Sequence, residues 1–119
     1  MPRVQGLTII VAEGNEPRFC TALTLAVAQV ALGGAARVYA HDAAVPLLVP
    51  ADRLAADDDG LPDRTGLLAM AGEAGVVLIA CQTGLARARL AMDALAPGVV
   101  AGGMVGLLAE LGDDRLVFA

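Results

Sequence analysis

The stretch that decides the fold is Val76-Val77-Leu78-Ile79-Ala80-Cys81-Gln82-Thr83-Gly84. Its first five residues are apolar and rich in β-branched types, and Gly75 precedes them, which is typical of a strand buried on both faces. Beyond Gly84 the apolar residues recur at helical spacing. The sequence therefore predicts that the thiol of Cys81 stands where a buried strand ends and a helix begins.

The same alternation of strand and helix extends along the chain in both directions. Further strands are expected at 7–12, 36–41, 99–101 and 115–118. Helices are expected at 17–32, 65–74, 84–95 and 104–111, with a short helical turn at 45–49. Strands that alternate with helices form parallel sheets covered by helices. We therefore expect one α/β domain over residues 1–119, a three-layer α/β/α sandwich with a five-stranded parallel sheet.

The composition predicts self-association. The chain has 119 residues, a length that suits one domain. Hydrophobic residues make up 57% of it, whereas soluble domains average about 45–50%. Only 3% of the residues are aromatic, so the core must be aliphatic and rich in alanine. One small domain cannot hide this much apolar surface, and we expect a homo-oligomer.

The charge pattern argues against a nucleic-acid partner. The formal net charge is −5, and the eight cations are all arginines, scattered singly. Nucleic-acid binding needs a basic patch, and the sequence shows none. Two uncharged runs, 19–36 and 94–109, carry glycines and polar residues, and we interpret them as buried soluble structure, so that no membrane partner is expected. Met1-Pro2-Arg3 leads straight into a strand, without the apolar region of a signal peptide.

The cysteines and aspartates do not predict a metal site. Cys20 and Cys81 are too few for a disulfide framework and form no zinc pattern with the lone His41. We therefore expect a reduced, cytoplasmic protein. Asp57-Asp58-Asp59 lies in an acidic loop at 50–63, but a calcium loop needs alternating ligands, and we interpret this run as a solvated loop. No metal and no cofactor are expected.

Polar and small residues gather where the predicted strands end, which is where parallel sheets bind their ligands. They are Asn15 after the first strand, His41 after the second, Cys81, Gln82 and Thr83 after the central one, and Gly102 and Gly103 after the fourth. Cys81 and His41 are the candidate catalytic residues, and the other five are candidate ligand-binding residues.

Two interpretations of Cys81 remain open at this point. Free N–H groups at a helix start stabilise a thiolate, and an imidazolium at His41 would add to this if the second and third strands are neighbours. Alternatively, Cys81 only packs at the end of a strand, and His41 is an exposed residue at a strand end. Cys20 falls inside a predicted helix among apolar neighbours, where we expect an unreactive thiol.

Several short motifs occur together in the second half of the chain. They are Ala80-Cys81-Gln82-Thr83-Gly84, Ala88-Arg89, Leu95, Val99-Val100-Ala101-Gly102-Gly103-Met104 and the closing Asp114-Arg115-Leu116-Val117-Phe118. In these motifs the chain resembles the DsrE/DsrF-like family. The first half of the chain is also similar, with Pro17 early in a long helix, Gly34 before the second strand and Val45-Pro46-Leu47-Leu48 after it. The resemblance thus covers nearly the whole chain.

This resemblance implies a five-stranded parallel sheet, trimers or hexamers, and a sulfur-relay activity. It assigns to Cys81 the role of accepting sulfane sulfur as a persulfide from a donor protein and passing it to an acceptor protein. The alternative is a non-enzymatic oligomeric module of the same fold that binds a small ligand or acts as a scaffold, in which Cys81 only packs. A peroxide-reducing thiol protein is less favoured, because it would need a resolving thiol and Cys20 lies in another helix.

Overall fold

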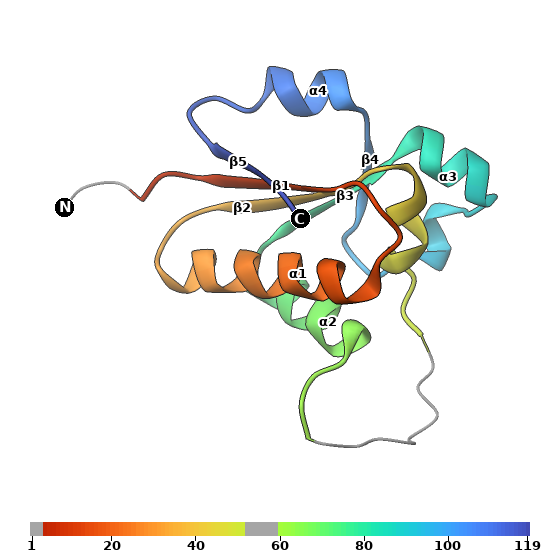
Figure 1. Cartoon of the computed structure of the whole chain (residues 1–119), viewed down its shortest axis with the longest axis horizontal. Helices are drawn as coiled ribbons and strands as arrows, with labels where there is room; N and C mark the ends of the chain where they lie inside the picture. The colour runs from red at the N-terminus through yellow and green to blue at the C-terminus, as the bar shows by residue number, and fades with distance from the viewer. Residues whose placement is uncertain (1–3, 52–59) are drawn as a thin grey trace.

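The chain folds around a five-stranded sheet in which all strands are parallel, in the order β4-β3-β2-β1-β5 (Figure 1). The computed structural model describes residues 4–51 and 60–119, so the Asp57–Asp59 run lies outside the described residues. The strands are β1 Leu7–Val11, β2 Ala36–Ala40, β3 Val77–Cys81, β4 Val100–Gly102 and β5 Arg115–Phe118. The predicted parallel sheet is confirmed, and the second and third strands are neighbours.

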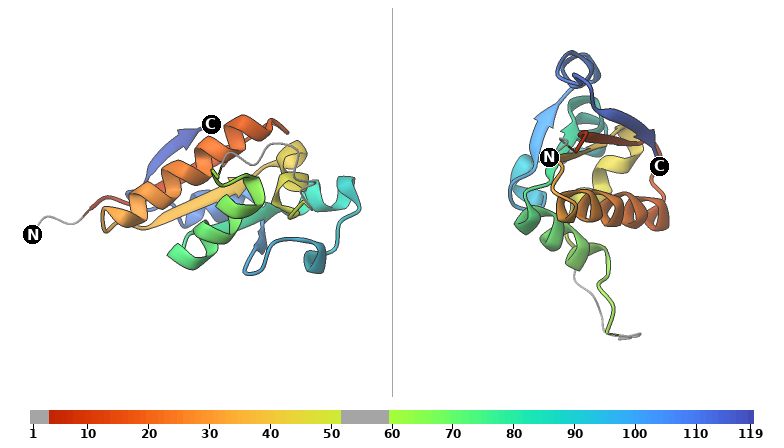
Figure 2. Two further views of the ribbon diagram at one scale, coloured as in Figure 1. Left: turned by 90° about the horizontal axis from the view of Figure 1, so that it is seen from below. Right: turned by 90° about the vertical axis from the view of Figure 1, so that its left-hand side faces the viewer.

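Two long helices cover one face of this sheet. They are α1, Glu16–Ala31, and α2, Arg64–Ala74, which lie side by side in Figure 2. Asn15 caps α1 and Asp63 caps α2, each by accepting a hydrogen bond from a first-turn N–H. Gly75 ends α2 with a φ of 87°, a conformation that glycine adopts without strain. The expected helices at 17–32 and 65–74 are confirmed within one residue.

The helix expected over 84–95 is wrong in its length. The observed helix, α3, covers Gln82–Ala88 and ends at Arg89, which has a φ of 53°. A short 3₁₀ helix, η2, follows at Met92–Ala94. The chain turns back because the N–H of Ala96 bonds to the carbonyl of Leu48, which places Leu95 and Ala96 in the core. The turn expected at 45–49 is the end of a longer 3₁₀ helix, η1, at Asp42–Leu48.

The third layer is thin. It consists of α4, Met104–Ala109, which crosses the face opposite α1 and α2 (Figure 1). Apolar side chains on this face remain exposed at its margins: Val77, Val100, Leu116 and Phe118, the last of them with 69% of its surface exposed. Part of the excess of apolar residues predicted from the composition is therefore exposed on the α4 side of the sheet, while Leu25, Leu32 and Met70 are exposed on the side of α1 and α2. Within the described residues, no helix combines the length and apolarity needed to cross a membrane.

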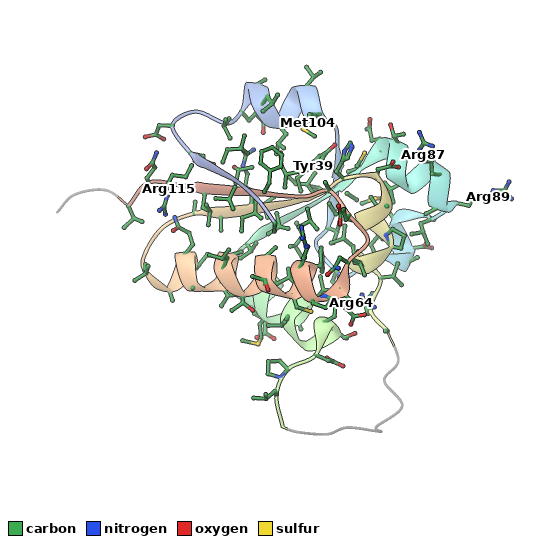
Figure 3. The ribbon with its side chains drawn as sticks, viewed as in Figure 1. Tyr39, Arg64, Arg87, Arg89, Met104 and Arg115 are labelled. Atoms are coloured by element: carbon green, nitrogen blue, oxygen red, sulfur yellow. The ribbon has the colours of Figure 1, made fainter. Side chains whose placement is uncertain are left out.

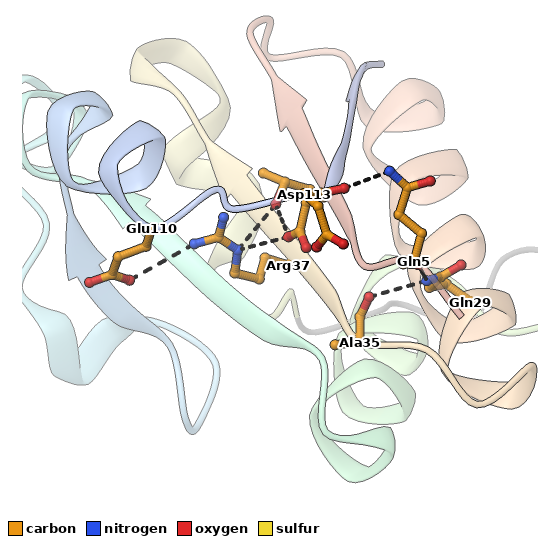
Figure 4. A network of polar contacts seen from close by, with 8 residues as sticks. Gln5, Gln29, Ala35, Arg37, Glu110 and Asp113 are labelled. Atoms are coloured by element: carbon orange, nitrogen blue, oxygen red, sulfur yellow. Dashed lines mark hydrogen bonds and ion pairs between the residues drawn. The ribbon is translucent and has the colours of Figure 1, made fainter. Parts of the chain in front are cut away.

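A polar network holds the amino ends of the strands together (Figure 4). The hydroxyl of Thr8, which is fully buried, donates to Asp114 Oδ2 at 2.8 Å and accepts from Arg37 Nε at 3.1 Å. Arg37 also faces Glu110 at 3.9 Å. On the other face, Gln29 donates to the carbonyls of Gln5 and Ala35. This network fixes β1, β2 and the start of β5 at the end of the sheet away from Cys81.

Thr8→Val is expected to lower the free energy of unfolding by about 1–3 kcal/mol, because valine removes the buried hydroxyl that bonds to the partly buried side chains of Asp114 and Arg37. Urea denaturation at fixed protein concentration measures this. Thr24→Val is the matched control, since the exposed Thr24 hydroxyl bonds to the carbonyl of Cys20 in its own helix and its loss should change stability by less than about 0.5 kcal/mol. Equal losses in the two variants would show that the Thr8 network does not stabilise the sheet.

Candidate functional site

The connections that leave β1, β2 and β3 pack tightly against one another at the carboxyl end of the sheet. A Cβ on Gly14 would lie 2.9 Å from the carbonyl oxygen of Ala43, and a Cβ on Gly84 would lie 2.7 Å from that of Asp42. The Cβ on Gly84 would also lie 2.5 Å from Cγ2 of Val45. Glycine at these two positions therefore allows η1 to sit between the connection that precedes α1 and the first turn of α3.

Cys81 ends β3 inside this cluster. Only 5% of its surface is exposed, and it lies opposite Gly102 of β4 in the sheet register. Because side chains alternate along a strand, Cys81 shares a face of β3 with Ile79, which is opposite Tyr39 of β2. Tyr39 is 1% exposed and lies on the α4 side of the sheet (Figure 3). The thiol thus sits beside a buried phenol.

Four hydrogen-bond donors outweigh the effect of burial on the Cys81 thiol. Burial raises its pKa, but the backbone N–H groups of Asp42, Gly84 and Thr83 and the hydroxyl of Tyr39 lower it, and the net pKa lies below the usual value. Burial also raises the pKa of Tyr39, and its contact with Cys81 raises that pKa further. Tyr39 therefore stays protonated and acts as a donor to the sulfur.

Cys20 shows the opposite behaviour. It lies half-buried in α1 as a free thiol, and burial raises its pKa, as does the charge of Glu16. The Arg64 guanidinium acts in the other direction but does not reverse the shift. The two cysteines of this chain therefore differ in the direction of their pKa shifts, and Cys81 is the more acidic thiol.

His41 stands next to Cys81 in the sheet, with its ring against Tyr39. It follows Ala40, which pairs with Ala80, so His41 and Cys81 leave neighbouring strands at the same level. Its ring stacks on Tyr39 with 6.1 Å between centroids, and its buried Nδ1 has no hydrogen-bond partner in the part of the chain that the structure describes. Among the described residues, the groups that shift the pKa of Cys81 do not include the His41 ring.

The other candidate residues have different surroundings. Thr83 supplies an N–H to the sulfur, while its exposed side chain and that of Gln82 lie at the rim. Gly102 faces Cys81 across the register, and a Cβ there would lie 2.9 Å from Ile79. Gly103 begins α4 and is exposed. The side chain of Asn15 caps α1 through the N–H of Arg18, at 2.9 Å, so its oxygen already has a partner.

Two contributors to the site, Tyr39 and Asp42, were not among the residues predicted from the sequence. Side chains alternate along β2, so Tyr39 lies on the same face of the sheet as Cys81 once β2 and β3 are known to pair. The sequence contains this alternation, but the strand order is needed to interpret it. Asp42 acts through its backbone N–H rather than its carboxylate. The φ of Asp42 is 45°. Aspartate tolerates this conformation, but nothing else in the sequence indicates it.

A cavity lies away from Cys81. Its volume is about 760 Å³, and it opens between α2, the start of β3 and the segment 96–100. Its lining is mostly apolar and includes Leu68, Val76 and Ala96. The described residues contain no group of three or more His, Cys, Asp or Glu side chains placed to hold a metal ion.

Two solved structures share this fold over almost their whole length. A protein of unknown function, MTH1491 from Methanobacterium thermoautotrophicum, matches with a TM-score of 0.75 and 16% identity, over 97% of this chain and 99% of that one. The ychN protein from E. coli matches with a TM-score of 0.73 and 22% identity, over 97% and 100%. No protein-family model and no curated protein matches the sequence. At these identities the two likenesses show the shared fold alone.

The two thiols are expected to titrate in different pH ranges. In the Cys20→Ser variant the thiolate absorbance of Cys81 should appear below the usual thiol pKa, and in Cys81→Ser that of Cys20 should appear above it. Tyr39→Phe in the Cys20→Ser background should raise the pKa of Cys81, because one donor is lost. An ultraviolet pH titration of the folded variants measures all three, and identical titrations of Cys20 and Cys81 would contradict the assignment.

The same shift has a consequence for stability. Because the pKa of Cys81 is lower in the folded protein than in the unfolded chain, its contribution to stability appears as the pH rises through the folded pKa and is complete above the unfolded pKa. Because the pKa of Cys20 is raised, its contribution to stability changes in the opposite direction as the pH rises. The Cys20→Ser variant removes that contribution and leaves the gain in stability from Cys81.

Proposed function

We propose that this protein is a sulfur carrier that holds sulfane sulfur as a persulfide on Cys81. The observation that supports the proposal is the set of donors around the thiol: three backbone N–H groups and one phenol lower its pKa although the residue is buried. The DsrE-like fold, shared with the two solved structures, agrees with this role. We assign the reaction to the cytoplasm, since both cysteines are free thiols.

Sulfur transfer at this site proceeds by thiol exchange. The Cys81 thiolate attacks the terminal sulfur of a donor persulfide, R–S–SH, and forms a new S–S bond while the donor S–S bond breaks. The donor leaves as a thiolate, and the proton on the transferred sulfur stays in place, so no external oxidant or reductant is needed. An acceptor thiolate then attacks the terminal sulfur, and Cys81 departs as a thiolate. A lowered pKa assists that departure.

The rim residues are assigned to partner contact rather than to thiol activation. Gln82 and Thr83 are exposed beside the thiol, and His41 and Gly102 flank Cys81 on the two neighbouring strands. We therefore place the donor or acceptor chain against this rim, with the backbone at Gly102 and Gly103 open to a close approach. Asn15 sits at the start of α1, where its side chain is already occupied by the cap.

Persulfide uptake is expected on one cysteine only. After incubation of the reduced protein with a small persulfide donor, intact mass should show one added sulfur on the wild type and on Cys20→Ser, and none on Cys81→Ser. Cyanide should remove the added sulfur and restore the original mass. Added sulfur on Cys81→Ser, or on none of the proteins, would remove Cys81 from the carrier role.

The binding module remains the second candidate, supported by the cavity between α2 and β3. Its volume of about 760 Å³ and apolar lining suit a small apolar ligand. In that case Cys81 would pack at the far end of β3 without reacting. An absence of labelling in every form, together with a native fold by circular dichroism, would favour this candidate.

We also propose that the protein forms a homo-oligomer, a trimer or hexamer, through the α4 side of the sheet. The support is the exposed apolar surface there, to which Val105 and Leu108 of α4 add the side chains that point away from the core. Covering this surface with further copies would remove it from water, which is favourable at about 25 cal/mol per Å².

Light scattering is expected to give several times the chain mass for the wild type. Phe118→Glu should shift the mass toward the monomer, because it places a charge on the exposed apolar face. Leu32→Glu is the matched control: Leu32 is 73% exposed, at the end of α1 on the other face, and its replacement should leave the mass unchanged. A wild-type monomer at all concentrations would contradict the oligomer.

A further inference from the structure

The backbone of Asp42 has an unusual conformation at the point where β2 ends. Its φ is 45°, in the left-handed region that few residues other than glycine enter, although aspartate and asparagine tolerate it. The residue begins η1, directly after His41. Fixed contacts flank it on both sides, since the N–H of His41 bonds to the carbonyl of Val11 and the N–H of Ala44 bonds to the carbonyl of His41, each at 2.9 Å.

Asp42 is also where η1 touches α3. A Cβ at Gly84 would lie 2.7 Å from the Asp42 carbonyl oxygen and 3.0 Å from its Cα, so only glycine permits this approach without a shift. The carboxylate of Asp42 pairs with Arg87, with 3.1 Å between Oδ1 and Nε. Arg87 extends outward from α3 toward solvent (Figure 3). The negative charge is thereby paired at the surface, while the backbone N–H of Asp42 lowers the pKa of the Cys81 thiol.

We propose that Asp42 is a positioning residue whose left-handed backbone, seated against Gly84, holds its N–H on the sulfur of Cys81. Two of the other donors, Thr83 and Gly84, belong to the same chain segment as Cys81 and follow it into α3. Asp42 comes from a different connection, so its donor is in place only when η1 and α3 are packed together. This packing, rather than the start of α3 alone, completes the thiolate site.

Among the described residues, the charged and titratable groups near the sulfur come from three elements. From β2 come Tyr39 and, at its end, His41; from η1 comes Asp42; and from α3 comes Arg87, which pairs with Asp42. A change in the backbone at Asp42 therefore acts on Cys81 chiefly through a lost donor. The role of Asp42 in sulfur transfer rests on the proposed carrier function, but its effect on the thiol is measured without any sulfur donor.

Variants at Asp42 separate the backbone from the carboxylate. Asp42→Gly and Asp42→Asn keep the left-handed conformation and lose the charge, whereas Asp42→Val keeps neither, since a β-branched residue is strongly disfavoured there. All are made in the Cys20→Ser background, and the rate of Cys81 alkylation is followed against pH. The valine variant should show a higher thiol pKa. At a pH below that pKa, its alkylation rate should fall about tenfold for each unit by which the thiol pKa rises. The glycine and asparagine variants should stay within about twofold of the parent.

Gly84→Ala tests the same contact from the other side. Its Cβ would push α3 away from Asp42 and Val45, and we expect it to raise the thiol pKa in the direction of Asp42→Val. Asp42→Ala imposes the same backbone strain more mildly and replaces the valine variant if circular dichroism shows that the latter does not fold. Unchanged pH profiles in the folded valine or alanine variant and in Gly84→Ala would overturn the proposal, as would equal changes in the glycine, asparagine and valine variants.

The outcome is independent of the carrier test. If the wild type takes up no sulfur while Asp42→Val still raises the thiol pKa, the carrier function fails and the positioning role stands. If sulfur uptake is normal and the pH profiles of all the Asp42 variants coincide with that of the parent, the positioning role fails and the carrier function stands.

Discussion

The contact between Gly84 and Asp42 is the constraint on which the site depends. It joins the connection after β2 to the connection after β3, and it brings donors from both to one sulfur. A side chain at residue 84 would separate them, because the nearest atoms belong to the backbone of Asp42 and to a packed valine. The fold therefore creates the chemical environment of Cys81 by tertiary packing, with the start of α3 providing only part of it.

The two ends of the sheet are stabilised differently. At the amino end of the strands, side chains of Thr8, Arg37 and Asp114 form a partly buried polar network. At the carboxyl end, glycines let backbone meet backbone, which leaves N–H groups free to face a sulfur. Side-chain networks fix the register, and the absence of side chains at Gly14 and Gly84 leaves room for the site.

Much of the fold could be predicted from the sequence because local patterns carry it. The buried strands are continuous apolar runs, and Pro17, Gly33 and Gly75 mark the ends of the helices. The short α3 could not be predicted, because it ends at Arg89 for a tertiary reason: the chain must return Leu95 and Ala96 to the core. The position of Cys81 could be predicted, but its donors Tyr39 and Asp42 could not, since they depend on strand order and on one backbone angle.

The two cysteines provide an internal comparison that bears on function. A thiol that only packs in a core is expected to show what Cys20 shows, a pKa raised by burial. Cys81 is more buried than Cys20, so burial alone would shift its pKa in the same direction. Its pKa is lowered because four donors oppose that effect, and donors to a thiolate stabilise the charged form rather than the neutral thiol. Packing does not require such an arrangement, whereas a thiol that must both attack and leave as a thiolate benefits from it in each step.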